Sequence, residues 1–474
     1  MNDIEKEGMW RRAARETARA GHVVHAMRRL SSIDSSFCHH ETTHGAVTTL
    51  RDAFWGPPFS NFAQRPVYQT MTTSGDSLLR PKPVDAAGLD DPDLRVRDLH
   101  DNEVLRRILT SIIRLRVLDE TFKAAQRQGK LSFYLESYGV GIQAIPQPLA
   151  HPSALPLTRG SRSPACQEET AIVASAAALE PKDDIFSQYR EHGALLWRGA
   201  SFEALAHQCC GSREDPAKGR QMPVHYGDRA RNFHTVSSPL ATQILHAVGF
   251  SYAKRLELGE RARKDAQSIV ACYFGDGTSS EGDFHAGLNF AATLQCPVVF
   301  ICRNNGYAIS TPTTEQYSGD GIASRAEGYG ITSCRVDGGD ARAVYSATRE
   351  ARRQALDTGR PILLELMTHR LGDHSTSDDR RNYVRQCRLI QAEREGDPIR
   401  RLASFLGVED DEKTAIRDAA LAEARHAIDA AHRTPRPDPA TMFEDIYDPL
   451  SVSQSYELVR QRQELLDYAG RSST

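Results

Sequence analysis

The chain has 474 residues, of which 59 are basic and 62 acidic, so its formal charge is close to neutral. This balance gives no electrostatic footprint for nucleic acid, and no apolar run approaches the roughly 20 residues that a membrane-spanning helix needs. The nine cysteines form no CxxC pair. They indicate buried thiols in a reducing compartment, not a disulfide framework. We expect a globular protein that has neither nucleic acid nor a membrane as its partner.

The N-terminal segment has the composition of a mitochondrial transit peptide. From Met9 to Ser32 it is rich in Arg and Ala, contains one acid and ends in serines, which places a cationic face on a helix. The preceding MNDIEKEG is acidic and does not belong in such a signal. Residues 1–32 are therefore either a transit segment starting at Met1 or Met9, or an ordinary basic amphipathic helix. Residues 33–100, rich in Ser, Thr, Pro and Gly, predict an extended arm.

A strong helical pattern runs from Asp101 to Gly129, and Gly129 suits the left-handed position after a helix. Its apolar residues recur at three- and four-residue steps: Leu105, Ile108, Leu109, Ile112, Leu115 and Leu118. The proline-rich stretch from Val140 to Gln167 that follows has no helical period. A structureless stretch that long is unusual inside a compact domain. It is either an insertion or an artefact of the gene model, such as a retained intron.

From Ser268 the chain alternates between strand and helix patterns. SIVACYF is an apolar strand, SEGDFHAGLNFAATLQ an amphipathic helix and CPVVFICR a second apolar strand. Strands apolar on both faces are typical of a parallel sheet covered by helices. ITSCRVDG and PILLELMTHR predict further strands, with a helix over Ala341 to Asp357 between them. We expect an α/β fold with a doubly wound, mostly parallel sheet over 101–395, followed by a helical region over 396–474.

Polar motifs follow two of these strands. Gly275-Asp276-Gly277 comes after the first, and Asn304-Asn305-Gly306-Tyr307 after the second. In open α/β sheets, ligands bind beyond the carboxyl ends of the strands. Glycines let the backbone approach a phosphate, and the next helix offers free amides. The carboxylate of Asp276 and the amide oxygen of Asn305 are hard ligands that suit Mg²⁺. The spacing therefore predicts a site for a phosphate and magnesium.

Several long motifs resemble one family. They are FSQYREHG, KGRQMPVHYG, SSPLATQ, GDGTSSEGD, RNNGYAIST, GDGIASRAEGYG and HSTSDD. All are similar to motifs of the alpha subunits of mitochondrial branched-chain 2-oxoacid dehydrogenases, the thiamine diphosphate-dependent decarboxylating component. The resemblance runs from about Pro66 to the C-terminus and leaves out Val140 to Gln167. It implies the thiamine diphosphate-binding fold, oxidative decarboxylation of branched-chain 2-oxo acids and a place in the mitochondrial matrix.

The resemblance also implies which residues bind the cofactor. Those that would bind thiamine diphosphate are Gln188, Tyr189, Arg190, Ser238, Leu240, Gly275, Asp276, Gly277, Arg303, Asn305 and His374. Arg190 and Arg303 would bind the diphosphate, and Leu240 would support the bent thiamine. The residues alone leave a second interpretation open: Tyr189 and Leu240 fit plain core packing, and Arg190 fits an exposed surface.

Two metal sites are implied in the same way. Asp276, Asn305 and the carbonyl of Tyr307 would bind Mg²⁺. A structural K⁺ would be held within SSPLATQ by Ser237, Pro239, Thr242 and Gln243.

The loop RLGDHSTSDD follows the last predicted strand on the ligand side of the sheet. An imidazole beside a diphosphate can exchange a proton at neutral pH. The resemblance implies that His374 is catalytic and serves acyl transfer to lipoyl, and that a dedicated kinase phosphorylates Ser375. Asp373 replaces the family's second histidine, and Arg385 replaces its second phosphoserine. We expect any such regulation to act through Ser375 alone.

The chain offers no separate candidate for the glutamate that activates the aminopyrimidine of the cofactor. In this family a beta chain provides it. The resemblance therefore implies a beta subunit in an α₂β₂ heterotetramer. Its further partners would be a lipoyl-bearing transacylase core and, if Ser375 is modified, a regulatory kinase and phosphatase.

Three alternatives remain. HETTH, from His40 to His44, fits a zinc-protease pattern that needs a helix, but its surroundings lack helical periodicity. A pyruvate dehydrogenase alpha subunit is the nearest relative in function, although SSPLATQ and HSTSDD favour the branched-chain form. A non-catalytic paralogue acting as an assembly partner is disfavoured by the intact Asp276, Asn305 and His374. The stretch at 140–167 nevertheless leaves the non-catalytic paralogue as an alternative, because an ordered insertion across the mouth of the site would block substrate.

Overall fold

The computed structural model describes residues 46–47, 67–71, 74–75, 99–137, 168–259, 267–370, 374–375, 378–384, 396–439, 441 and 456–472. All of them belong to one compact unit, Gly45–Thr474. The expected transit segment, HETTH, most of the arm, the stretch at 140–167, Asp373 and Arg385 lie outside these residues.

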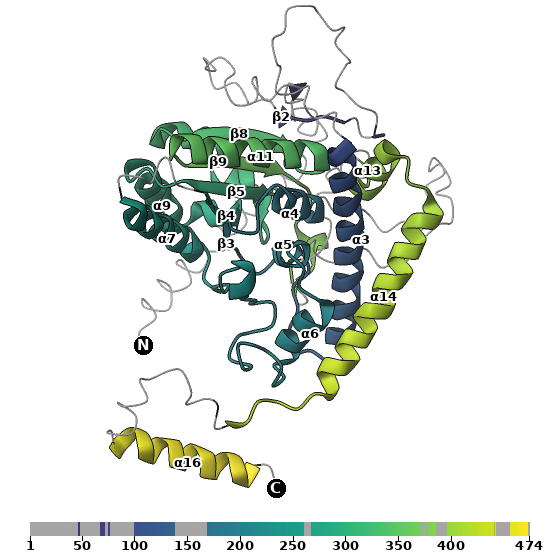
Figure 1. Cartoon of the computed structure of the whole chain (residues 1–474), viewed down its shortest axis with the longest axis vertical. Helices are drawn as coiled ribbons and strands as arrows, with labels where there is room; N and C mark the ends of the chain where they lie inside the picture. The colour runs from purple at the N-terminus through teal and green to yellow at the C-terminus, as the bar shows by residue number, and fades with distance from the viewer. Residues whose placement is uncertain are drawn as a thin grey trace, which may run out of the picture. The chain divides into compact units, whose positions relative to one another are not determined.

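A parallel sheet forms the centre of this unit (Figure 1). In the described residues its order is β1-β2-β8-β9-β5-β4-β3. The strands are β1 (Ala46–Val47), β2 (Val67–Tyr68), β3 (Asp184–Phe186), β4 (Val270–Gly275), β5 (Val298–Asn304), β8 (Thr332–Asp337) and β9 (Ile362–Met367). Every pairing between neighbours is parallel. The predicted sheet is confirmed. A separate antiparallel pair joins β6 (Tyr307–Ala308) and β7 (Thr311–Pro312).

Helices cover both faces of the sheet. The α-helices are α3 (Leu99–Arg127), α4 (Glu168–Ala177), α5 (His192–Trp197), α6 (Phe202–Cys210), α7 (Thr242–Leu258), α9 (Gly282–Thr293), α10 (Thr313–Gln316), α11 (Ala341–Thr358), α13 (Pro398–Leu406), α14 (Asp410–Arg433) and α16 (Tyr456–Ser472). Side chains of α7 and α9 share one hydrophobic cluster with the sheet, and those of α3, α4, α11 and α14 share another. None of the described helices is both long and apolar enough to cross a membrane.

The apolar run of β4 explains why the sheet needs both layers. Ala271 and Tyr273 enter the cluster on the α3–α11 side, while Val270, Cys272 and Phe274 enter the cluster on the α7–α9 side. Side chains alternate between the two faces of a strand, so a continuous apolar run is buried only when helices cover both faces.

The end of α3 lies where the sequence predicts it. Gly129 has a φ of 75° and donates its amide to the carbonyl of Gln126. This left-handed position terminates the helix and avoids the penalty that a Cβ would bring. In the described part of the C-terminal region α13, α14 and α16 are helices, and α14 packs along α3 and α6.

The carboxyl ends of three neighbouring strands lie level with one another. Gly275 of β4 is in register with Arg303 of β5, and Asn304 of β5 with Met367 of β9. The connection through α9 covers one face and the connection through α11 covers the other. Such a change of face opens a crevice at the strand ends, which is where GDG, NNGY and the histidine loop begin.

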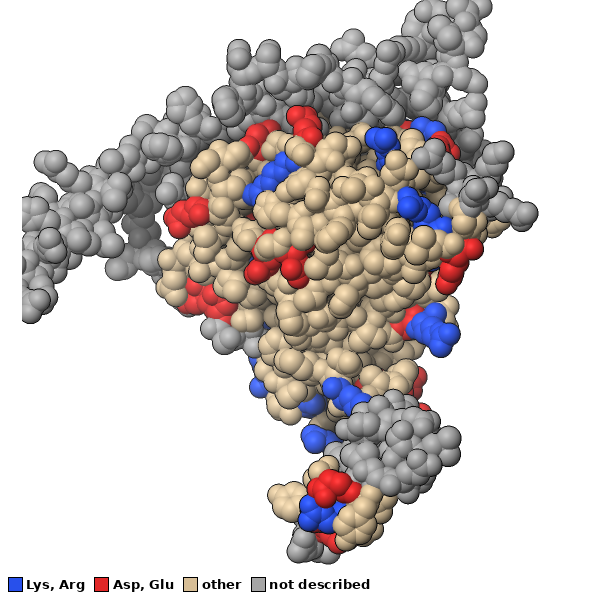
Figure 2. All heavy atoms as spheres, turned by 90° about the vertical axis from the view of Figure 1, so that its left-hand side faces the viewer, with Lys and Arg blue, Asp and Glu red and all other residues tan. Residues whose placement is uncertain are grey.

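Figure 2 turns the molecule to the side on which α7 and α9 lie. Residues other than Lys, Arg, Asp and Glu cover most of the described surface there, between scattered charged side chains. Leu256 on α7 and Phe290 on α9 are large apolar side chains that are 59% and 52% exposed. Aromatic residues such as Phe are enriched at protein interfaces.

Candidate active site

The turn after β4 holds a buried carboxylate. Asp276 is 1% exposed, and its backbone amide donates to the carbonyl of Arg303 on β5. Its carboxylate accepts from Gln316 Nε2 at 3.2 Å and from the backbone amide of Asn305. Burial raises the pKa of Asp276 to about 6, against the lowering effect of these hydrogen bonds. The turn thus brings the acid of GDG against the asparagine of NNGY, as predicted.

Hydrogen bonds link the three residues expected to bind Mg²⁺. The amide of Asn305 donates to the Asp276 carboxylate, and Asn305 Oδ1 accepts from the amide of Tyr307 at 3.1 Å. In the described part of the chain, no group of three or more His, Cys, Asp and Glu is placed to hold a metal ion. One carboxylate with amide and carbonyl oxygens is instead a donor set that suits Mg²⁺. The residues present therefore fit that ion.

Gly277 is required by close packing. A Cβ on Gly277 would lie 2.7 Å from the Cβ of Ala308 in the β6–β7 hairpin. At Gly275 the nearest atom would be Gln188 Oε1 at 3.6 Å, an ordinary contact. The second glycine of GDG therefore lets the NNGY hairpin close over the turn, in addition to the backbone access expected for it.

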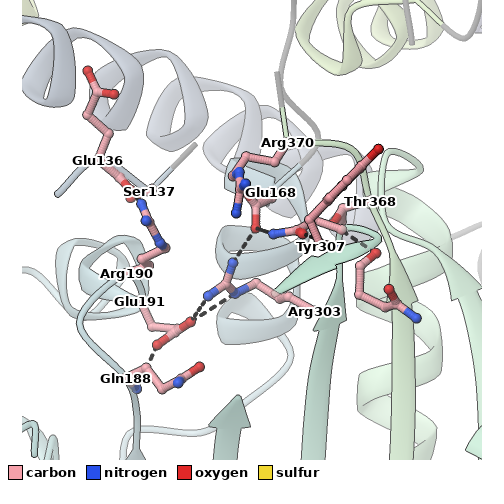
Figure 3. Close-up of polar contacts among 12 residues, drawn as sticks. Glu136, Ser137, Glu168, Gln188, Arg190, Glu191, Arg303, Tyr307, Thr368 and Arg370 are labelled. Atoms are coloured by element: carbon pink, nitrogen blue, oxygen red, sulfur yellow. Dashed lines mark hydrogen bonds and ion pairs between the residues drawn. The ribbon is translucent and has the colours of Figure 1, made fainter. Parts of the chain in front are cut away.

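Arg303 is surrounded by carboxylates (Figure 3). Its Nε lies 2.8 Å from Glu191, which also contacts Nη2, and its Nη1 lies 2.5 Å from Glu168. All three side chains are buried, and the two carboxylates raise the pKa of Arg303 against the effect of burial. From the sequence we expected Arg303 to bind the diphosphate of the cofactor, and we did not predict either glutamate. In the structure the charge of Arg303 is balanced within the chain.

Arg190 has different partners. Its guanidinium donates to two backbone carbonyls, those of Glu136 and His374. The side chain is 5% exposed, burial lowers its pKa, and no ion pair joins it to a carboxylate among the described residues. This leaves a buried cation available to an anionic ligand, which agrees with the expected role and not with an exposed surface arginine.

Arg370, which follows the end of β9, is a second buried arginine near His374. We did not predict it from the sequence. Its Nη1 lies 3.4 Å from His374 Nδ1, and its Nη2 donates to Ile309 and to Tyr383 Oη at 3.0 Å. Its Nε is buried without a hydrogen-bond partner in the described structure. Its place beyond a predicted strand end was the one sequence signal for it.

His374 lies between these two arginines. Nη2 of Arg190 and Nη1 of Arg370 each approach its Nδ1 to 3.4 Å. Burial, with the charges of Arg190 and Arg370, lowers the pKa of His374 to about 3, so its imidazole is neutral. Its amide donates to Asp378 at 2.6 Å. Ser375, the expected phosphorylation site, follows it and is half-buried.

Gln188 and Tyr189 enter the site from the end of β3. Gln188 Nε2 donates to Thr278 Oγ1 at 2.9 Å, next to the GDG turn, and its amide donates to Glu191. Tyr189 is half-buried, with its ring 5.7 Å from the Arg190 guanidinium and 6.2 Å from the ring of His225. Gln188 therefore lies against the GDG turn, and Tyr189 lies beside Arg190.

The SSPLATQ segment forms the turn into α7. Ser238 is exposed and its Oγ lies 2.6 Å from His225 Nε2, while Leu240 is half-buried. His225 thereby connects Ser238 to Tyr189. Ala241 takes a φ of 69° before the helix begins.

The oxygens expected to hold K⁺ gather at the same turn. Thr242 Oγ1 lies 2.9 Å from Ser237 Oγ and 3.0 Å from the carbonyl of Pro239. Gln243 donates to the carbonyl of Tyr273, and its Oε1 is buried without a partner in the described structure. A buried oxygen without a partner calls for a further donor or an ion, and the neutral oxygens of this segment suit a monovalent cation.

Residues 157–440, more than half of the chain, match the family model "Dehydrogenase E1 component". The parallel sheet, the GDG and NNGY turns at its carboxyl edge and the flanking arginines define the same class of protein. This class depends on thiamine diphosphate.

Curated relatives narrow the class. The chain is 42% identical over 404 residues to "2-oxoisovalerate dehydrogenase subunit alpha, mitochondrial" of Mus musculus, covering 84% of this chain and 79% of the relative. The Homo sapiens protein of that name is 42% identical, with 85% and 79% covered, and the Caenorhabditis elegans protein 44% identical, with 77% of each covered. The chain belongs to the family of 2-oxoisovalerate dehydrogenase alpha subunits. As an alpha subunit it has a beta-subunit partner, and the mitochondrial names of its relatives agree with the expected location.

Proposed function

We propose that the chain is the alpha subunit of a branched-chain 2-oxoacid dehydrogenase in the mitochondrial matrix. The activity is that of a 3-methyl-2-oxobutanoate dehydrogenase (2-methylpropanoyl-transferring), acting on the 2-oxo acids from Val, Leu and Ile breakdown. The observation that carries the proposal is the meeting of Asp276 and Asn305 at adjacent strand ends, within a family of that name.

In this proposal the chain holds the diphosphate end of thiamine diphosphate. Asp276, Asn305 and the Tyr307 carbonyl bind Mg²⁺, while Arg190 and Arg370 offer their charges to the diphosphate. Arg303 stays part of the site, but Glu168 and Glu191 balance its charge. Bound thiamine diphosphate supplies the carbanion stabilisation that decarboxylation needs.

His374 serves the acyl transfer. The bond between the keto carbon and the carboxylate breaks and CO₂ leaves. The acyl carbon then forms a thioester with one sulfur of the lipoyl group, whose disulfide is reduced as the other sulfur takes a proton. A neutral imidazole held between Arg190 and Arg370 can donate its N–H to a lipoyl sulfur.

The proposal extends to the assembly. A structural K⁺ at Ser237, Pro239, Thr242 and Gln243 fixes the turn into α7, and an α₂β₂ heterotetramer supplies the missing glutamate from the beta chain. Phosphorylation of Ser375 by a kinase, reversed by a phosphatase, regulates the loop. The lipoyl-bearing transacylase core accepts the acyl group. The exposed apolar side chains of Leu256 on α7 and Phe290 on α9 support burial of this side against another subunit.

The proposed domain organisation of the chain is a transit segment over 1–32, an extended arm over 33–100, the thiamine diphosphate-binding α/β domain over 101–395 and a helical region over 396–474. Peptide mapping of the native protein tests the stretch at 140–167. Peptides from it would mark an insertion, and their absence would mark a gene-model artefact.

The decisive assay is decarboxylation by the chain co-expressed with its beta partner, in thiamine diphosphate and Mg²⁺. 2-Oxoisovalerate should be turned over in clear preference to pyruvate. Preference for pyruvate would make the chain a pyruvate dehydrogenase alpha subunit. No turnover of either acid by a complex with bound cofactor would support a non-catalytic paralogue.

A further inference from the structure

Glu168, the first residue of α4, contacts the site although it lies far from it in the sequence. Its side chain is fully buried. Its Oε1 accepts from Arg303 Nη1 at 2.5 Å and from Asn305 Nδ2 at 3.0 Å. Figure 3 shows Glu168 directed at Arg303 from the helix above it. One carboxylate oxygen thus joins Arg303 of β5 to Asn305, a candidate metal ligand.

The contact matters because the two ends of an asparagine amide have opposite chemistry. Only Oδ1 can bind a cation, whereas Nδ2 carries two N–H donors. In the structure Nδ2 is tied to Glu168, and Oδ1 accepts one hydrogen bond from the Tyr307 amide. Oδ1 keeps a second lone pair. Without Glu168, rotation of the amide by half a turn would present N–H groups to the metal.

We infer that Glu168 is a positioning residue for the metal site. By accepting a hydrogen bond from Asn305 Nδ2, it fixes the amide so that Oδ1 is the end offered to Mg²⁺. This inference rests on the proposed function and adds to it the residue that orients the amide of Asn305. Groups behind metal ligands commonly set ligand orientation in this way.

Two simpler roles compete with orientation. Glu168 could attract the metal by its negative charge alone, or it could act only by holding Arg303. Glu191 separates both of these roles from orientation of Asn305. It is equally buried and pairs with the same guanidinium, but its carboxylate also accepts from the amide of Gln188 and not from Asn305.

The test measures metal binding directly. Mn²⁺, which accepts the same oxygen ligands as Mg²⁺, is titrated into the assembled α/β protein with saturating thiamine diphosphate. The free ion is followed by electron paramagnetic resonance. Glu168→Leu should weaken Mn²⁺ binding by about tenfold or more. Glu168→Gln, which keeps an acceptor oxygen, should lose clearly less, and the control Glu191→Leu should resemble the Gln variant.

The Asn305→Asp background gives a sharper result. A carboxylate has oxygens at both ends, so it needs no orientation. Glu168→Leu should therefore not weaken Mn²⁺ binding there, and removing a neighbouring negative charge should leave it equal or stronger. Equal weakening by Leu and Gln, or weakening by Leu in both backgrounds, would overturn the inference because it would assign the effect to charge.

Asp276→Asn distinguishes the inference from the proposed function. Unchanged Mn²⁺ binding in that variant would refute the metal site itself. Loss of binding in Asp276→Asn with no effect of Glu168→Leu would refute the positioning role alone. If the Leu variant does not assemble, Glu168→Met, of similar length, takes its place in both backgrounds.

Discussion

Arg190 donates a hydrogen bond from its guanidinium to the main-chain carbonyl of His374, 184 residues further along the chain. The same nitrogen lies 3.4 Å from the ring nitrogen Nδ1 of His374. A residue that follows β3 thus fixes the loop that follows β9, and it places a positive charge beside the imidazole. Arg190 therefore contributes both to the position of His374 and, together with burial and Arg370, to its neutral state.

The first prediction concerns pH. Burial and the charges of Arg190 and Arg370 lower the pKa of His374 to about 3, whereas an unfolded chain titrates near 6.5. The unfolded state therefore binds more protons below pH 6.5, and stability falls as the pH drops from there towards 3. Above pH 6.5 both states are neutral and the residue contributes nothing. By pH 5 the wild type should lose about 2 kcal/mol more than His374→Gln.

Thermal unfolding of the assembled protein at pH 7 and pH 5 checks this. The melting temperature should fall further for the wild type than for His374→Gln, which carries no titrating ring. Equal falls in the two proteins would mean that His374 titrates normally in the folded state.

The second prediction concerns Ser375. Asp378 accepts from the amide of His374 and from the hydroxyl of Tyr383, and its own amide donates to the Ser375 carbonyl. A phosphate on Ser375 adds about −1.5 to −2 charges beside that carboxylate. We expect Ser375→Glu to loosen the loop and lower acyl transfer to lipoyl. Ser375→Ala should keep activity and resist inactivation by the kinase.

Limited proteolysis of the loop and acyl-transfer rates measure both effects. Full inactivation of Ser375→Ala by the kinase would show that another residue carries the regulation.

The third prediction concerns Gly277. Gly277→Ala would force a Cβ to within 2.7 Å of Ala308, and overpacking of this kind costs about 1–3 kcal/mol. We expect a lower melting temperature and weaker cofactor binding, because the clash pushes the NNGY hairpin away from Asp276. Gly282→Ala is the matched control, since nothing lies within 4 Å of its Cβ. Equal behaviour of the two variants would contradict the packing seen at GDG.

The fourth prediction concerns potassium. Replacing LiCl by KCl should raise the melting temperature of the wild type, because an ion that binds only the folded state stabilises it. Thr242→Val keeps the shape of the side chain and removes the oxygen that lies 2.9 Å from Ser237, so it should abolish the difference. A potassium effect of the same size in Thr242→Val would place the ion elsewhere.

Much of the architecture could be predicted because it depends on local pattern. The apolar runs at β4 and β5 indicate strands buried on both faces, and parallel strands bring their carboxyl ends to one edge. That geometry alone predicts that Asp276 lies near Asn305. Gly129 ends its helix as its residue type predicts.

The missed residues depend on long-range contacts, which leave no periodic signal. Glu168 and Glu191 meet Arg303 across 135 and 112 residues of chain. Neither glutamate lies near Arg303 in the chain, so nothing in the sequence indicates that a carboxylate pairs with this arginine. Only the folded structure, which brings Glu168 at the start of α4 and Glu191 just before α5 to Arg303 on β5, reveals that its charge is balanced.

The central claim is that Asp276 and Asn305 hold thiamine diphosphate through a divalent metal. Calorimetric titration of thiamine diphosphate into the assembled α/β protein, with Mg²⁺ or with EDTA, tests it most directly in wild type and in Asp276→Asn. The account predicts tight binding by the wild type in Mg²⁺, and much weaker binding in EDTA or in Asp276→Asn. Tight binding in EDTA, or wild-type affinity in Asp276→Asn, would contradict it.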